Sequence, residues 1–214
     1  NVIVPASIAA AEIEGGELLS LTAPDQTESK APMTFFVTSE AHSGNLSGLA
    51  GADATCQRLA AAVGAGNRTW RAYLSTQGSQ TEPGVNARDR IGKGPWHNAK
   101  GVMIAASVAD LHGDIERDRN LLFRETALNE KGELINGRVR PDGAQNEHDI
   151  LTGSDSHGRA FPAGFSQAGV DLTCRNWTYD GPDGRAMIGH HDRMSGWNTS
   201  WNSQIARSCC ARVA

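Results

Sequence analysis

The sequence lacks several features that would assign the protein to a class at once. No apolar run reaches the roughly 18–20 residues that an α-helix needs to cross a bilayer, so we expect no transmembrane span. The net charge is −4, whereas nucleic-acid-binding domains normally carry a basic excess. No nucleophile elbow, P-loop or HExxH motif occurs, and no carboxylate pair stands out. These absences argue against a membrane-spanning protein, a nucleic-acid binder and the common enzyme classes.

Aromatic and apolar residues are also scarce, while glycine is abundant. Aromatics make up 6% and hydrophobic residues 39% of the chain, and 24 of the 214 residues are glycine. This balance favours a loop-rich fold of short elements over a helical bundle. The length suits one core with an extension, and the polar, proline-containing character of residues 1–32 predicts an N-terminal arm before a domain at 33–214.

The compartment is indicated by the cysteines and by the first residues. Four cysteines, one in the first third of the chain and three near its end, are typical of long-range disulfides in an oxidising compartment. A zinc site is the alternative, but no CxxC spacing is present. The apolar opening followed by Ala9, Ala10 and Ala11 is similar to the end of a secretory signal peptide, or it forms an N-terminal strand or tether.

Short elements of both kinds are predicted along the chain, which gives an α+β protein. Strands are expected at 33–39 and 69–76, where in the second Trp70, Ala72 and Leu74 alternate with polar residues. A helix is expected over 51–67, ended by Gly64 or Gly66. Further expectations are a short helix at 85–92, an element of undecided type at 102–111, a hairpin at 121–137 with a Lys131-Gly132 turn, and short strands near 148–155, 176–179 and 186–188.

An ordered set of motifs runs along the chain, namely FVTSEAHSGNLSGLAGADATCQRLA with TWRAYLST, then ILTGSDSHGR, CRNW, GRAMIGHHDR and SWNSQIARSC. This set resembles the endostatin-like branch of the C-type-lectin fold, in its bacterial secreted members, and the match covers about Met33 to Cys210. The resemblance implies a mixed α+β domain with two small sheets and long surface loops. The missing catalytic motifs favour a non-enzymatic role.

The resemblance also implies nested disulfides, with Cys56 paired to Cys210 and Cys174 paired to Cys209. The chain departs from the family here, because its last two cysteines are adjacent and no closing "L-Y-C-F" strand follows. Adjacent residues on a strand point to opposite faces, so two different partners are sterically plausible.

The residues between Gly153 and Asn202 are the best candidates for a binding surface, because His, Asp and Trp side chains there are interleaved with glycines. We expect ligand contacts from a set within this stretch: His190, His191, Asp192, Arg193, Asp180, Asp183, Trp197 and Asn198. The alternative is structural, with one histidine packed and Asp192 paired to Arg193, and with the DGPDG acids forming only a turn. Two interpretations are open for the tryptophans of this stretch: they stack on a sugar ring, or they belong to the core. These residues are Trp177, Trp197 and Trp201.

No metal or cofactor is expected. The calcium motifs of sugar-binding members are incomplete, since Trp197-Asn198-Thr199 and Trp201-Asn202-Ser203 lack the third carboxylate. Adjacent His190 and His191 point in opposite directions on a strand, so a metal would need a more distant ligand.

The function predicted from the sequence is therefore a secreted, periplasmic or cell-surface binding module that recognises a protein or glycan partner through loops of 153–202. The second hypothesis is an accessory subunit of a larger extracytoplasmic assembly, anchored through residues 1–32. The third is an enzyme, because a related fold includes enzymes that use a reactive cysteine pair, which Cys209-Cys210 resembles only weakly.

Overall fold

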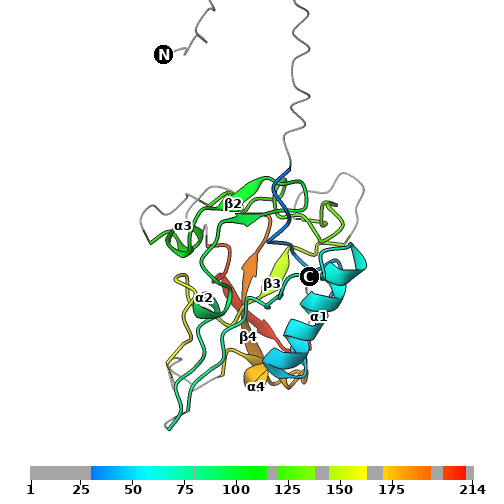
Figure 1. The fold of residues 1–214 in the computed structure, drawn as a ribbon. Coiled ribbons are helices and arrows are strands. Elements are labelled where there is room, and N and C mark those ends of the chain that lie inside the picture. Colours follow the sequence, from blue (N-terminus) through cyan, green and yellow to red (C-terminus); the bar gives the residue numbers. More distant parts are fainter. Residues whose placement is uncertain are drawn as a thin grey trace, which may run out of the picture.

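The computed structural model describes residues 30–79, 81–114, 120–137, 145–162, 171–193 and 200–210, and these form an α+β protein with two small antiparallel sheets (Figure 1). The predicted arm at 1–32 lies almost wholly outside these residues. In chain order the elements are α1 (Gly48–Ala62), α2 (Ala87–Arg90), β1 (Trp96–His97), β2 (Met103–Ala105), α3 (Val108–His112), β3 (Asp149–Leu151), α4 (Cys174–Trp177), β4 (Arg185–His190) and β5 (Ile205–Ser208).

Helix α1 confirms the predicted helix and ends at the first of its two candidate glycines. Leu59 and Ala60 are buried on one face, while Val63 has left the helix and is 40% exposed. The amides of Val63 and Gly64 donate to carbonyls of the last turn, and Gly64 has φ +80°. This is the left-handed conformation that glycine adopts at helix ends without steric cost.

The two segments predicted as strands at 33–39 and 69–76 are extended, but they are not ladder strands of either sheet. Trp70, Ala72 and Leu74 are buried, as the alternation predicted. The backbone amides of Trp70 and Ala72 donate to side chains of α1 instead of to another strand, namely Gln57 Oε1 at 3.1 Å and Asp53 Oδ1 at 2.9 Å. A buried backbone amide needs a hydrogen-bond acceptor, and here side-chain oxygens take the place of the carbonyl groups of a neighbouring strand.

Local signals account for the middle of the chain. The undecided stretch 102–111 divides into β2 and α3, because Ser107 caps the helix by accepting a hydrogen bond from the Asp110 amide at 3.2 Å. The short helix predicted at 85–92 is α2. The predicted turn at Lys131-Gly132 is present, with Gly132 at φ +81°, but no sheet strands flank it.

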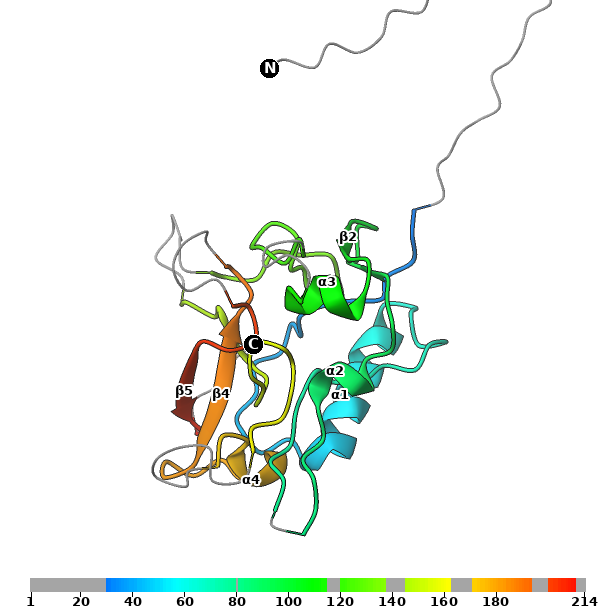
Figure 2. The same ribbon diagram turned by 90° about the vertical axis from the view of Figure 1, so that its left-hand side faces the viewer.

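The second sheet has the order β3-β4-β5, with β4 in the centre. Its β3–β4 register pairs Asp149 with His190, and β4–β5 pairs Arg185 with Ser208. Figure 2 shows β4 and β5 on the side of the molecule opposite α1. Strand β4 confirms the strand predicted at 186–188. This sheet brings residues 148–151 beside residues 188–190, which are far apart in the sequence.

The strand predicted at 176–179 is wrong, because α4 there is a left-handed turn. Cys174, Arg175, Asn176 and Trp177 have φ between 48° and 68°, a conformation that costs about 1–2 kcal/mol per L-residue. Buried contacts hold it in place: the Trp177 side chain is fully buried and its Nε1 donates to the Ser75 carbonyl at 2.7 Å. Burial of Trp177 and Trp201 favours the core reading of these two tryptophans; Trp197 lies outside the described residues.

Only one of the two expected disulfides is formed. Cys174 and Cys209 are bonded with 5.6 Å between their Cα atoms, and both side chains are buried. Cys56 and Cys210 are free thiols, so the pairing expected for them is wrong in this structure. Cys209 is buried and Cys210 is exposed, and both lie in the turn that follows β5. Cys210 therefore faces away from the interior, where half-buried Cys56 lies.

Two apolar clusters form the core. One surrounds Trp96, Ile104 and Trp201, and the other surrounds the disulfide, Leu74 and Trp177. Within the described part of the chain, no helix has both the length and the apolar character needed to cross a bilayer.

Candidate functional site

The predicted ligand residues that follow β4 are interior residues. His190 is half-buried, and His191, Asp192 and Arg193 are buried. Asp192 Oδ1 lies 2.9 Å from His148 Nδ1, and Arg193 Nη2 donates to the carbonyl and side-chain oxygens of Asn120, both at 3.0 Å. These three residues thus join the end of β4 to neighbouring loops, and Arg193 also lines the polar pocket described below, so their contact with a partner stays a prediction.

The other predicted residues do not join this group. Asp180 and Asp183 are exposed in the turn before β4, whereas His190 is the last residue of that strand. Six strand residues span about 20 Å, so the two ends of β4 cannot share one small ligand. Asp183 accepts a short hydrogen bond from the Tyr179 hydroxyl and lies 3.5 Å from Arg175, which is the pattern of a turn. Trp197 and Asn198 lie outside the described residues.

A histidine–carboxylate cluster lies where β3 begins and β4 ends, and two of its members were not predicted. Asp149 Oδ1 is 3.1 Å from the Nε2 atoms of both His148 and His190. The two imidazole rings are stacked, with centroids 4.1 Å apart and planes inclined by 12°. Burial of His148 lowers its pKa, although the Asp192 carboxylate acts in the opposite direction. Two ring nitrogens and one carboxylate oxygen within 4.8 Å of one another are the donors of a transition-metal site.

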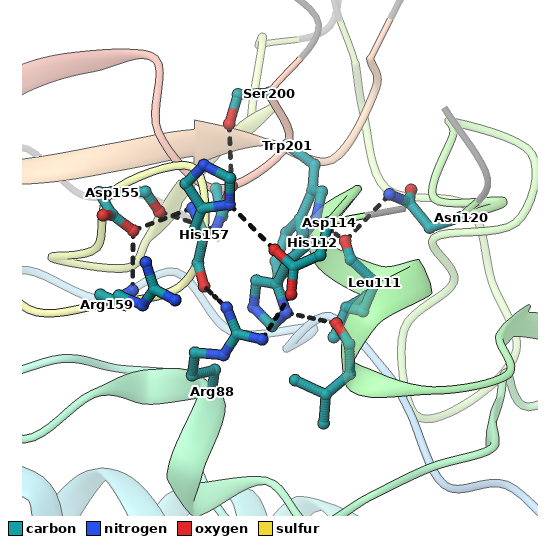
Figure 3. Close-up of polar contacts among 12 residues, drawn as sticks. Arg88, Leu111, His112, Asp114, Asn120, Asp155, His157, Arg159, Ser200 and Trp201 are labelled. Atoms are coloured by element: carbon teal, nitrogen blue, oxygen red, sulfur yellow. Dashed lines mark hydrogen bonds and ion pairs between the residues drawn. The ribbon is translucent and has the colours of Figure 1, made fainter. Parts of the chain in front are cut away.

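A second site, which we call the polar pocket, lies between the end of α3 and the loops at 155–159 and 200–202 (Figure 3). Its volume is about 270 Å³. Polar side chains supply much of its wall, namely His112, Asn120, Ser156, His157, Arg193, Ser200 and Asn202. Part of the predicted 153–202 binding stretch therefore lines a real hollow in the surface.

An Arg–Asp–His chain beside the polar pocket fixes one of its histidines. Arg88 Nη2 lies 2.6 Å from Asp114 Oδ2, and His157 Nδ1 lies 2.9 Å from Asp114 Oδ1. Figure 3 shows Arg88 and His157 approaching the Asp114 carboxylate from different elements. The hydrogen bond from Arg88, and then that from His157, lowers the pKa of Asp114 to about 2. This carboxylate is therefore ionised at neutral pH, and it orients the His157 ring, whose side chain is 49% exposed.

The inner wall of the polar pocket is set by a second chain of hydrogen bonds. His112 Nδ1 contacts the Val108 carbonyl at 2.7 Å, and because a carbonyl only accepts, this nitrogen carries the proton. Nε2 then accepts from the Tyr73 hydroxyl at 2.7 Å, and Asn202 Nδ2 donates to the same hydroxyl at 2.8 Å. Burial lowers the pKa of His112 and raises that of Tyr73, so both side chains are neutral at pH 7. This part of the wall is thus a hydrogen-bonded set of uncharged side chains.

A larger, apolar cavity lies elsewhere, between α1, the segments at 34–38 and 69–74, and β3. Its volume is about 460 Å³, and Phe35, Phe36, Trp70 and Ile150 are among its lining residues. The Cys56 thiol lies in its wall, where burial raises the pKa of this thiol to about 11. Cys56 is therefore protonated at neutral pH and is a poor nucleophile.

Comparison with known proteins gives no assignment: no protein-family model matches this chain, and no curated protein matches it. The C-type-lectin-like resemblance of its motifs thus stays a prediction, and the function has to be inferred from the side chains described above.

Proposed function

We propose that the protein is a non-enzymatic binding domain of the C-type-lectin-like fold, which recognises a glycan partner through the polar pocket. The observation that carries the proposal is the rigid wall of this pocket. Arg88 pairs with Asp114, and Asp114 in turn orients His157. Tyr73 hydrogen-bonds to His112 and is itself hydrogen-bonded by Asn202. The polar groups are therefore positioned before any ligand arrives. Preorganised groups lose little conformational entropy on binding.

A carbohydrate suits the chemistry of this wall. Sugar hydroxyls donate and accept hydrogen bonds, and the pocket presents imidazole, amide and hydroxyl groups that do the same. Leu111 and Trp201, which are buried residues of the core, form an apolar part of the pocket wall. The buried Cys174–Cys209 disulfide supports a secreted, periplasmic or cell-surface location, because disulfides persist in oxidising compartments.

A glycan array followed by calorimetry, each with and without EDTA, tests the proposal. We expect His157→Ala to weaken binding about tenfold or more, the effect of losing one well-placed hydrogen bond of about 1.5 kcal/mol. His97→Ala is the matched control, because His97 is a half-buried histidine of β1 that does not line the pocket. The proposal fails if no glycan binds above background, or if His157→Ala binds as tightly as the unaltered protein.

The apolar cavity favours a second candidate function, an accessory subunit of a larger assembly anchored through residues 1–32. Aromatic side chains such as Phe36 and Trp70, whose ring centroids are 4.9 Å apart, line a cavity large enough for side chains of a partner. Native mass spectrometry of the protein isolated from its source is the test. A stoichiometric complex that Phe36→Glu disrupts and His157→Ala preserves would support this role, and a monomer with glycan affinity would contradict it.

A further inference from the structure

We propose that His148, Asp149 and His190 bind a transition-metal dication such as Zn²⁺. The three side chains come together because β3 and β4 pair in a register that sets Asp149 opposite His190. His148 immediately precedes β3, and its ring stacks on that of His190. Their donor atoms lie within 4.8 Å of one another and come from two rigid strand ends. This site is separate from the polar pocket that carries the proposed function.

The separation of the donor atoms fits a metal ion. Donors about 2.1 Å from a zinc ion in tetrahedral positions are about 3.4 Å apart. Asp149 Oδ1 is 3.1 Å from each of the two Nε2 atoms, so small side-chain movements would admit an ion. The side chains of His148, Asp149 and His190 are 11%, 19% and 12% exposed, so the cluster lies near the surface and not in a sealed core.

The hydrogen-bonding pattern also points to a cation among these three atoms. Asp192 Oδ1 accepts from His148 Nδ1, and this leaves the lone pair of a neutral His148 on Nε2, beside the Asp149 carboxylate. Asp149 Oδ1 lies 3.1 Å from the Nε2 atom of each imidazole ring. A lone pair facing a carboxylate oxygen is repulsive unless a cation lies between them. One proton can join only two of these atoms, whereas one metal ion coordinates all three.

Neighbouring residues complete the arrangement expected around a metal. Asp192 is almost fully buried and takes the place of the outer carboxylate that orients a metal-binding histidine. Arg207 Nε lies 3.3 Å from Asp149 Oδ2 and so holds the second carboxylate oxygen away from the two histidines. Two nitrogens and one oxygen suit Zn²⁺, Cu²⁺ or Ni²⁺, whereas Ca²⁺ and Mg²⁺ prefer oxygen ligands throughout.

Calorimetric titration of the full chain with Zn²⁺ tests the site, and Ca²⁺ is the comparison. Both free thiols are first replaced, as Cys56→Ala and Cys210→Ala, because Cys210 is exposed and would compete for the metal. We expect one Zn²⁺ per chain and no Ca²⁺ binding. His190→Ala should abolish the binding, Asp192→Asn should weaken it about 10–100-fold, and His97→Ala should leave it unchanged.

A spectroscopic measurement keeps the proposal testable if His190→Ala does not fold. Imidazole ¹⁵N NMR shifts of the thiol-free protein should show Zn²⁺ on the Nε2 atoms of two histidines, with Nδ1 of His148 still protonated. The proposal is overturned if Zn²⁺ does not bind up to millimolar concentration, if binding survives in a folded His190→Ala variant, or if no histidine Nε2 signal moves. In that case the cluster is a purely structural ion pair.

Discussion

Replacing Cys174 and Cys209 together by alanine removes the disulfide and should lower the free energy of unfolding by about 4 kcal/mol. The bond closes a chain separation of 35 residues, and loop-closure entropy for a loop of this length gives about 3.8 kcal/mol. Domains of this kind are stable by only about 5–15 kcal/mol. The disulfide therefore supplies a large fraction of the total, and the altered protein should unfold at much lower denaturant concentration.

Guanidinium unfolding followed by tryptophan fluorescence measures this change, because the buried Trp177 packs in the same cluster as the disulfide. The matched control is the double replacement of Cys56 and Cys210, which are free thiols and should contribute about 1 kcal/mol or less. Equal losses in the two double variants would refute the reasoning. So would a Cys56–Cys210 link in peptide mass mapping under non-reducing conditions.

Three further predictions concern single residues. Asp53→Asn should lower the free energy of unfolding by about 2–3 kcal/mol, because this nearly buried carboxylate accepts hydrogen bonds from two arginines and a backbone amide. The control is Asp183→Asn, which replaces an exposed carboxylate and should change the melting temperature little. Asp114→Asn should lower the free energy of unfolding by its full amount above pH 4, and this difference should vanish as the pH falls towards 2, because the pKa of Asp114 is depressed in the folded protein. Chemical unfolding of both proteins at each pH measures the difference. Arg175→Gly should raise the free energy of unfolding by about 0.5 kcal/mol, measured by thermal denaturation, because glycine adopts a φ of 55° more readily than arginine.

Local signals in the sequence predicted the elements that depend on neighbouring residues. The α1 helix follows from its apolar spacing and from Gly64, and β4 lies where short strands were expected. The α4 turn was predicted as part of a strand, because no residue of the CRNW segment requires a left-handed backbone. Its conformation depends on contacts with residues such as Ser75 and Cys209, which are distant in the sequence.

The candidate sites depend even more on distant contacts. The sequence drew attention to His190 and Asp192, and it indicated that a metal would need a ligand from elsewhere. It could not supply His148 and Asp149, which were taken as a strand end, because only the β3–β4 register brings them to His190. In the polar pocket the Asp114–His157 contact likewise joins residues 43 positions apart.

The left-handed turn at Cys174–Trp177 makes the protein a good subject for chemical synthesis with mirror-image amino acids. The conformational map of a D-residue is the inverse of that of an L-residue, so the φ of 55° and ψ of 52° at Arg175 fall in the preferred helical basin of D-arginine. Cys174 also offers a natural junction, because a peptide that begins with cysteine can be joined to a thioester ending at Thr173. A semisynthetic protein with D-arginine at position 175 would keep its charged side chain while relieving the backbone.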